Sequence, residues 1–328
     1  MLGIDFIGEW CVYWILGFEL PITGGFLSLF IPKQWWFRYL PGLFRRISLL
    51  VAFLIGFPFL FNWWGVQKTL SSFNYFVIMG RTYHFNFEHV LKQRRNDISG
   101  VLHVGAHSAE EAYIYKKLKI APVLWIEARP DLIEKINGRL ESLCLLNNGH
   151  YVRHGAVWSV SDVYCRLRIA TNDMSSSLLN LGKSHQKYFP FVRKASENPE
   201  IEINTVTIRD LVEQFLLEMN HSLSEMELEE KQSSDNKFSV KKFNFLYLNV
   251  QGAELPALKG CGNGILSNLD YVLTGISIED HFQNGTRLDS LDEYLGIYGL
   301  VREATCLPPI GQGNALYKRV RPATAENK

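Results

Sequence analysis

The residues of this chain best suited to chemistry are a glycine at a predicted turn and an acid that follows it. Val101–Glu111, VLHVGAHSAEE, begins as an apolar strand and continues as a helix, so Gly105 falls at the strand-to-helix turn. A glycine there lets a ligand lie against the backbone, beside free N–H groups of the helix. Glu127 ends the next apolar run, 22 positions later. A carboxylate at that place accepts hydrogen bonds from ribose hydroxyls.

The glycine count of this turn distinguishes two classes of enzyme that share the arrangement. A dinucleotide dehydrogenase needs G-x-G-x-x-G, because the backbone must wrap a pyrophosphate. Positions 107 and 109 are His and Ala here, so a nicotinamide cofactor is disfavoured. S-adenosylmethionine (SAM) has no phosphate and tolerates a looser turn. An ordinary turn, whose acid is simply solvated, remains the alternative.

Three further segments make the interpretation more specific. Leu248–Gly260, LNVQGAELPALKG, follows a buried strand, Asn172–Leu178 is the serine-rich NDMSSSL, and Gly311–Tyr317 is GQGNALY. Together with the first turn they resemble the FkbM family of SAM-dependent methyltransferases. That family has a G-A-N/H-x-G turn, an I-E acid, a serine-rich segment, D-V-Q-G-A-E-x-x-x-L-K-G and a closing G-W-G-D-A-L-Y strand. The resemblance covers about residues 99–319, and VQGAE with LKG is its most specific part.

The resemblance implies a class I methyltransferase fold, SAM as methyl donor, and usually O-methylation of a hydroxyl on a sugar, polyketide or glycoconjugate. It implies that Gly105 contacts SAM, that Glu127 holds the ribose, and that Gln251 and Glu254 shape the floor of the site. The residues predicted to bind the cofactor are Gly105, His107, Glu127, Asn249 and Gln251. Those predicted to bind the substrate are Ser175, Ser176, Ser177 and Glu254.

The chain departs from the family pattern at acidic positions. Asn249 and Asn314 stand where the family usually has Asp, Gly275 stands where many members have Glu, and Ala109 replaces a glycine. An Asp after the fourth core strand could orient the sulfonium or act as a base, whereas Asn can only hydrogen-bond. These losses weaken the catalytic prediction more than the fold prediction, because methyl transfer depends mostly on positioning.

Two histidines are candidates for the missing base, since a neutral imidazole can accept a proton near pH 7. His281 follows the fifth core strand, at the predicted mouth of the site, and is the first choice. His107 is the second. The predicted catalytic residues are therefore Asn249, His281 and His107. An exposed loop histidine at 281, and a residue that only shapes the turn at 107, are the alternatives. His103, inside the first strand, is expected to be a core residue.

Apolar runs alternating with amphipathic stretches from residue 99 onward predict an α/β fold. The predicted architecture is a Rossmann-like, class I methyltransferase fold with a doubly wound, mostly parallel sheet of about seven strands. Leu223–Lys242 is charge-dense and predicted to be an exposed loop. The predicted strands are Gly100–Val104, Val123–Ile126, Tyr151–Val157, Val163–Ala170, Ile201–Val206, Phe243–Val250, Tyr271–Ile278 and Ala315–Arg319. The predicted helices are Ala109–Lys119, Pro130–Glu141, Ile208–Glu218, Glu254–Lys259 and Arg287–Tyr298.

The first 67 residues differ in composition and are predicted to attach the protein to a membrane. Ile47–Gln67 carries no charge and is long enough for a bilayer, which needs about 20 apolar residues. Trp63 and Trp64 suit the headgroup region. Pro58 interrupts the run, and Lys33–Arg46 mixes basic and aromatic residues, as a segment lying in the membrane plane would. Insertion without crossing, a true span and a packed hydrophobic subdomain are the three alternatives.

The predicted chain order is a membrane segment at 1–67, a connecting region at 68–98, the methyltransferase-like domain at 99–319 and a disordered tail at 320–328. Basic residues before the apolar run would place the later residues outside the cytosol. Five scattered cysteines and a cytosolic cofactor argue for a cytosolic domain instead. Insertion without crossing removes this conflict.

Composition limits the functional classes. Lys and Arg number 34 against 33 Asp and Glu, so the chain lacks the basic excess of a nucleic-acid-binding protein. The cysteine spacing fits no zinc site, and no metal is predicted. The leading hypothesis is a membrane-associated SAM-dependent O-methyltransferase, with membrane lipid as a partner and a hydroxyl-bearing sugar, glycoconjugate, lipid-linked or metabolite acceptor. The alternative is a catalytically degraded binding module that keeps the fold as a scaffold.

Overall fold

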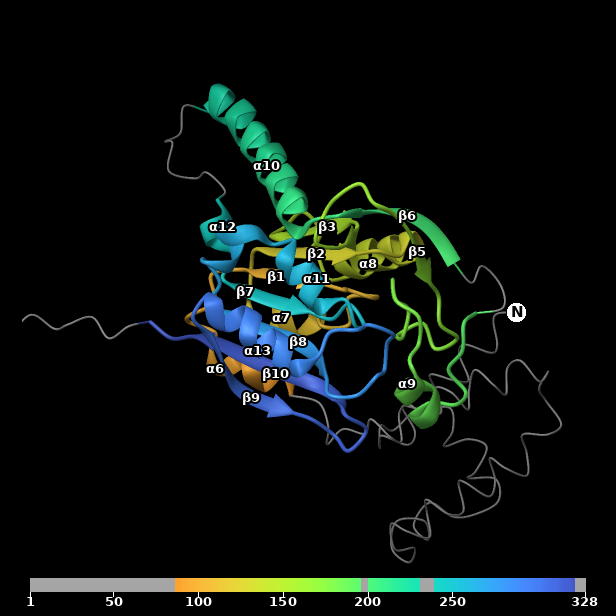
Figure 1. Ribbon diagram of the computed structural model, residues 1–328. Helices are drawn as coiled ribbons and strands as arrows, with labels where there is room; N and C mark the ends of the chain where they lie inside the picture. The colour runs from red at the N-terminus through yellow and green to blue at the C-terminus, as the bar shows by residue number, and fades with distance from the viewer. Residues whose placement is uncertain (1–85, 196–199, 231–238, 322–328) are drawn as a thin grey trace, which may run out of the picture. The chain divides into compact units, whose positions relative to one another are not determined.

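The structure is a computed structural model that describes residues 86–195, 200–230 and 239–321 (Figure 1). Its centre is a seven-stranded sheet with the order β3-β2-β1-β7-β8-β10-β9. The first five strands are parallel, and β10 is antiparallel to both of its neighbours. The strands are β1 (Val101–Val104), β2 (Val123–Glu127), β3 (His150–His154), β7 (Phe245–Leu248), β8 (Tyr271–Ser277), β9 (Leu300–Cys306) and β10 (Gln312–Arg319).

The central strands are apolar on both faces, because helices cover the sheet on each side. Every residue of β1 and β2 is buried, as expected of parallel strands inside an α/β fold. Successive side chains alternate between two cores, so Leu102 and Val104 pack on one face and Val101 packs on the other. One face carries α6 (Phe87–Gln93), α7 (Ala112–Leu118) and α8 (Pro130–Ser142); the other carries α10 (Ile208–Glu230), α11 (Glu254–Lys259), α12 (Gly262–Leu266) and α13 (Leu288–Ile297).

The mostly parallel, doubly wound sheet confirms the predicted fold class, but three predicted strands do not all belong to it. The run predicted at Tyr151–Val157 breaks at Gly155 into β3 and β4 (Ala156–Val157). A Cβ atom at Gly155 would lie 2.6 Å from a methyl group of Val206, so the chain turns where a side chain has no space. Beyond the break, a second sheet has the order β4-β6-β5, with β5 at Tyr164–Arg168 and β6 at Glu200–Val206.

One helix boundary was predicted wrongly, and one strand was missed. The helix predicted to end at Glu218 continues as α10 to Glu230, into residues predicted to be a loop. That stretch lacks glycine and proline and is rich in Leu, Met and Glu, so its charge does not oppose a helix. β9 was not predicted at all. Only its first residue is buried, because it is an exposed edge strand with no apolar alternation to reveal it.

The predicted membrane segment, 1–67, and most of the tail, 322–328, lie outside the described residues. Within the described ranges, no helix is both long and apolar enough to cross a bilayer. The connecting region contributes α6, whose first turn is capped by the Asn86 side chain, which accepts a hydrogen bond from the His89 N–H at 3.0 Å. α6 thereby places Phe87 beside the carboxyl ends of the central strands.

Three of these strand ends meet because the strands run in register. Val104 pairs with Ile126 of β2 and with Leu248 of β7. Directly after them, Gly105 has φ +80°, and a Cβ atom there would lie 2.0 Å from the carbonyl oxygen of Asn249. Position 105 must therefore be glycine because the backbone after β7 comes so close. The missing side chain also leaves space for a ligand.

We expect Gly105→Ala to lower the free energy of unfolding by about 3 kcal/mol, because it combines a backbone clash with a strained left-handed conformation. The measurement is urea unfolding followed by circular dichroism. Gly138→Ala is the matched control. Gly138 lies within α8 with no atom within 4 Å of its added Cβ, so the same change there should stabilise by about 0.5–1 kcal/mol. Equal effects of the two changes would contradict the proposed clash.

Candidate cofactor and acceptor site

A cavity of about 430 Å³ lies over the carboxyl ends of β1, β2 and β7. This is where open α/β sheets bind their ligands, and the volume suits a nucleoside-sized molecule. Seven of the predicted site residues line it: Gly105, His107, Glu127, Ser176, Ser177, Asn249 and Gln251. The structure therefore brings most of the predicted site together from four separate parts of the sequence.

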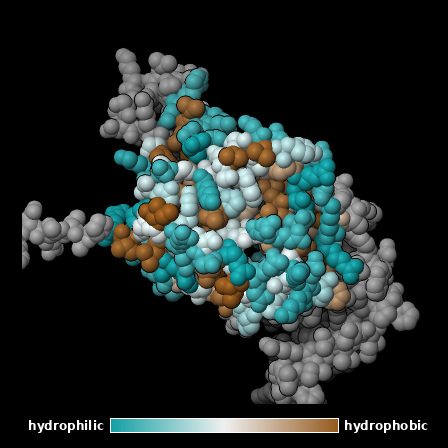
Figure 2. Space-filling model, viewed as in Figure 1, coloured by the Kyte–Doolittle hydropathy of each residue, from teal (hydrophilic) through white to brown (hydrophobic). Residues whose placement is uncertain are grey.

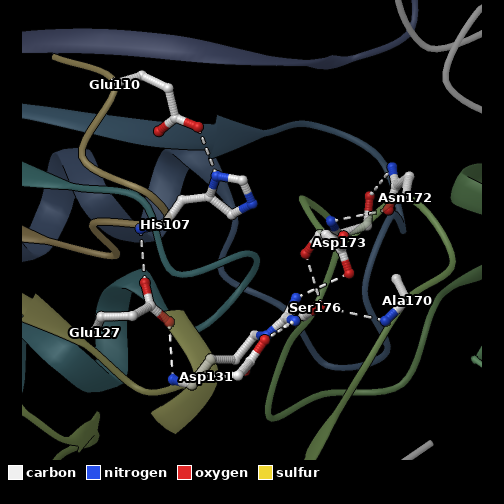
Figure 3. Close-up of polar contacts among 10 residues, drawn as sticks. His107, Glu110, Glu127, Asp131, Ala170, Asn172, Asp173 and Ser176 are labelled. Atoms are coloured by element: carbon white, nitrogen blue, oxygen red, sulfur yellow. Dashed lines mark hydrogen bonds and ion pairs between the residues drawn. The ribbon is translucent and has the colours of Figure 1, made fainter. Parts of the chain in front are cut away.

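Glu127 joins the turns that follow β1 and β2 (Figure 3). One carboxylate oxygen accepts the backbone N–H of His107 at 2.7 Å, and the other accepts the N–H groups of Ala128 and Arg129 at 2.9 Å each. The side chain is 8% exposed, and burial raises its pKa although these bonds oppose the shift. The oxygen that accepts the His107 N–H can accept a second hydrogen bond, so Glu127 can still bind a ribose hydroxyl.

His107 lies in the turn after β1 in a left-handed conformation, φ 47°. Its Nδ1 contacts the Glu110 carboxylate at 2.8 Å (Figure 3), and its buried Nε2 has no hydrogen-bond partner. Burial lowers the pKa of His107, but the hydrogen bond and the charge of Glu110 outweigh burial, so its net shift is upward. The same contact holds the pKa of Glu110 at about 2, against the opposing effect of burial.

The serine-rich segment forms one wall of the cavity. Ser177 Oγ donates to the backbone carbonyl of Gln251 at 2.7 Å, which ties this wall to the turn after β7. Ser176 Oγ donates to the carbonyl of Asp173 at 2.7 Å. Ser175 is 3% exposed and exchanges hydrogen bonds with Asn172, so it holds the turn and does not line the cavity. Arg129, after β2, anchors the same wall through an ion pair with Asp173 at 3.0 Å.

The departures from the family pattern converge beside the turn after β7. Asn314 of β10 pairs in register with Gly275 of β8, and Asn249 Oδ1 would lie 3.5 Å from a Cβ atom at Gly275. Asn249 Oδ1 also accepts the side-chain amide of Gln251 at 2.8 Å. Three positions that are often acidic in the family are therefore neutral here, and they lie close together.

Glu254 occupies the space beside these neutral residues. Its Oε1 accepts hydrogen bonds from the backbone N–H groups of Val250 and Gly252, at 3.2 and 3.1 Å, so it shapes the turn after β7. Burial raises its pKa to about 7. It lines a separate cavity of about 40 Å³, not the large one, although Asn249, Gln251 and Asn314 line both. Glu254, predicted to bind substrate, therefore does not line the large cavity.

His281 does not lie at the mouth of the site. It is fully buried, and its Nε2 donates to the carbonyl of Ile310 at 2.7 Å. Its ring stacks on Tyr188, with centroids 5.9 Å apart, and burial lowers its pKa. The loop after β8 folds back under α9 (Lys183–Tyr188), and so the predicted first-choice base lies in a satellite core. His103 is buried as expected and contacts Tyr115 Oη through Nδ1 at 2.9 Å.

Sequence reasoning missed Glu111, which also lines the large cavity. Its side chain is 25% exposed, and its Oε2 lies 3.8 Å from Nε2 of His103. Burial raises its pKa to about 7. The sequence does contain a signal for it. Glu111 is a second acid next to Glu110, in the turn after Gly105, where the helix begins.

A sequence model described as the methyltransferase FkbM domain matches residues 103–304. Among curated proteins, no sequence matches this chain significantly. The chain is also similar to several solved methyltransferases. One is methyltransferase FkbM from Methylobacillus flagellatus KT, with 14% identity over 84% of this chain, 60% of that chain and a TM-score of 0.42. This chain thus spans less than two thirds of that protein.

Two further solved structures are similar at lower identity. The METTL16 methyltransferase domain is 10% identical over 79% of this chain and 81% of that chain, with a TM-score of 0.40. TrmK from M. capricolum, in complex with the cofactor product S-adenosylhomocysteine, is 8% identical over 72% and 71%, with a TM-score of 0.34. The sequence match over 103–304 confirms the resemblance and, with it, SAM as the predicted cofactor.

We expect the His107 ring to titrate above the ordinary histidine value of about 6.5, and Glu110→Gln to lower that titration, because the change removes the neighbouring charge. Histidine NMR across pH 5–9 measures both. The stabilisation from this pair is complete below the unfolded pKa and is lost as pH rises through the folded pKa. Glu134→Gln, on the exposed surface of α8, is the matched control and should leave the titration unchanged. A parent titration at or below 6.5 would contradict the contact.

Proposed function

The chain belongs to the FkbM methyltransferase family, and we propose that it transfers the methyl group of SAM to a hydroxyl group of a glycan, lipid-linked or secondary-metabolite acceptor. The observation that carries the proposal is the 430 Å³ cavity with Glu127 in its wall and Asn249 at the end of β7. Bound SAM would supply a methyl group on a positively charged sulfur, which an oxygen nucleophile can attack. Everything else is positioning by the protein.

The residues of the cavity fit an adenosine group on the β2 side. Glu127 offers lone pairs to ribose hydroxyls, while its three backbone hydrogen bonds fix its position. Leu132 and Val157 supply apolar lining near it. The reacting sulfur would then lie toward Gly105 and Asn249, because the two strands that carry them are adjacent. Asn249 can orient it through its amide without taking a proton.

The serine wall supports a hydroxyl-bearing acceptor. Ser176, Ser177 and Gln251 present polar groups to the cavity, and Met174 lines it while remaining 46% exposed. A mixed polar and apolar wall that reaches solvent suits an acceptor larger than the cavity. Of the two histidines predicted as bases, only His107 lines the cavity. Its unpartnered Nε2 and raised pKa make it the better proton acceptor, and in the proposal it replaces His281.

The proposal includes attachment to a membrane through residues 1–67, with the catalytic domain in the cytosol. The uncharged run Ile47–Gln67 with its tryptophans supports attachment. A cytosolic domain has direct access to SAM, and the four described cysteines are free thiols. An enzyme held at a bilayer would meet lipid-linked acceptors at high local concentration.

We expect Glu127→Gln to weaken SAM binding about 10- to 100-fold, because a neutral amide forms weaker hydrogen bonds with ribose hydroxyls than a carboxylate does. Glutamine is preferable to alanine, since it retains one oxygen for the backbone N–H groups. Isothermal titration calorimetry measures the affinity, and Glu134→Gln is the control for the same chemical change on an exposed surface. Unchanged affinity in Glu127→Gln would remove the ribose assignment.

We expect deletion of residues 1–67 to move the protein from the membrane fraction to the soluble fraction while SAM affinity stays within about two-fold, because the predicted cofactor residues all lie later in the chain. Flotation on a density gradient and calorimetry are the two measurements. A truncated chain that aggregates, when the full chain is soluble without detergent, would favour a packed hydrophobic subdomain. Clear SAM binding without turnover on any hydroxyl acceptor would favour the scaffold alternative.

A further inference from the structure

One end of the large cavity is built differently from the rest. Phe87, Tyr247 and Leu273 line it, and all three pack in the core on the face of the sheet covered by α6 and α7. We call it the Glu111 compartment, and its lining residues are Phe87, Glu111, Tyr247, Leu273 and Asn314. None of these residues was assigned a function above. The compartment combines one carboxyl group with two aromatic rings, and no lysine or arginine lines it among the described residues.

Glu111 differs from the other acids that line the cavity because, among the described residues, it forms no ion pair with a lysine or arginine. Burial and the charge of Glu110 outweigh its weaker attraction to His107 and Arg139, so its net pKa shift is upward. Glu110 contacts His107 and Ser108, Asp173 pairs with Arg129, and Glu127 accepts three backbone N–H groups. The nearest partner of Glu111 is the His103 imidazole at 3.8 Å. Burial holds the pKa of His103 at about 3, so this ring is neutral and brings no positive charge. The five residues that line the compartment therefore include no cationic side chain.

The aromatic rings favour the same kind of ligand. Phe87 and Tyr247 meet edge to face with centroids 5.2 Å apart, and both line the compartment. The negative face of an aromatic ring attracts a cation, and carboxylate with aromatic rings is a recurring arrangement for binding substituted ammonium groups. A bound ammonium group would place a positive charge beside the Glu111 carboxylate.

The cofactor carries such a group at a suitable place. Glu111 lies at the start of α7 and lines the same cavity as Gly105 and Glu127, so it would be available to the amino-acid end of SAM if Glu127 held the ribose. We propose that the Glu111 compartment binds the α-ammonium group of the methionine part of SAM, with Glu111 as its counter-ion. This inference rests on the proposed function, since it requires that SAM bind in the large cavity.

The consequence is a cofactor affinity that depends on pH. Without ligand, the pKa of Glu111 is about 7, so at pH 6 most of the protein carries a neutral carboxyl group there. An adjacent ammonium favours the charged form, and binding must release a proton below that pKa. Affinity should therefore rise with pH between about 5.5 and 7.5. The groups facing Glu111 are His103 on β1, Tyr115 on α7, Tyr247 on β7, Glu110 and His107 in the turn, and Arg139 on α8.

The test compares three ligands on the full-length chain by calorimetry. S-Adenosylhomocysteine keeps the ammonium and lacks the sulfonium charge, SAM carries both, and 5′-methylthioadenosine lacks the amino-acid end. Glu111→Gln should weaken S-adenosylhomocysteine and SAM about 10- to 100-fold, the worth of one charge-assisted hydrogen bond, and 5′-methylthioadenosine less than about two-fold. Glu134→Gln should change none of the three.

The pH dependence supplies the second readout. For the parent, S-adenosylhomocysteine affinity should rise from pH 5.5 to 7.5, and titrations in two buffers of different ionisation heat should show proton release at pH 6. Glu111→Gln should abolish both effects, and Glu111→Asp should retain them at reduced affinity. Melting curves check the fold of each variant. Glu111→Gln should be at least as stable as the parent at pH 8, because it removes a buried charge.

Each other outcome overturns the inference in a recognisable way. Equal weakening of all three ligands by Glu111→Gln would show a structural role for Glu111. Weakening of SAM alone would place the sulfonium, not the ammonium, in the compartment. Unchanged affinity for S-adenosylhomocysteine would remove Glu111 from the cofactor site. A folded parent that binds none of the three ligands would instead refute the proposed function on which the inference rests.

Discussion

The carboxylate of Glu127 is the interaction on which the site depends. It accepts backbone N–H groups from the turn after β1 and from the turn after β2. It thereby adds to the backbone hydrogen bonds that Gly105 and Ala106 already donate to Ile126. Arg129, whose N–H is one of the three donors, extends the connection to the serine wall through Asp173. The position of the serine wall therefore depends, through Arg129, on the carboxylate of Glu127. A substitution at Glu127 acts on both sides of the cavity at once.

A second constraint is the absence of space between the ends of β1 and β7. The carbonyl of Asn249 occupies the place where a side chain at Gly105 would lie, so the floor of the cavity is backbone packed on backbone. Such a floor has little freedom to adjust, which suits a reaction governed by positioning. The charges at this end of the sheet are unevenly placed: Asn249, Gly275 and Asn314 are neutral together, while the partly exposed Glu111 and the buried Glu254 are acids with raised pKa values.

The sequence alone predicted the parts of the site that depend on local pattern. Gly105, Glu127 and the turn after β7 were predicted because a strand, a turn and a helix leave a signature within a dozen residues. His281 was misplaced because its position depends on a loop that folds under α9, and no local pattern encodes that contact. Glu111 was missed for a related reason, since its environment comes from His103, Phe87 and Tyr247 on three other elements. The strand predicted at Tyr151–Val157 is interrupted by Arg153, His154 and Gly155, and the structure divides it at Gly155 between two sheets.

The two sides of the cavity are built from different elements, and they therefore differ in how well they tolerate substitutions. The cofactor side consists of strand ends of the central sheet, held by buried backbone contacts that tolerate few changes. The proposed acceptor side consists of the serine-rich segment, which follows β5 of the small three-stranded sheet. This segment contacts the turns of the central sheet through the Ser177–Gln251 hydrogen bond and the Asp173–Arg129 ion pair. Substitutions between β5 and α9 can reshape that wall without moving Glu127. If the proposed function holds, differences in acceptor choice should arise in this segment, and the central sheet should hold the donor.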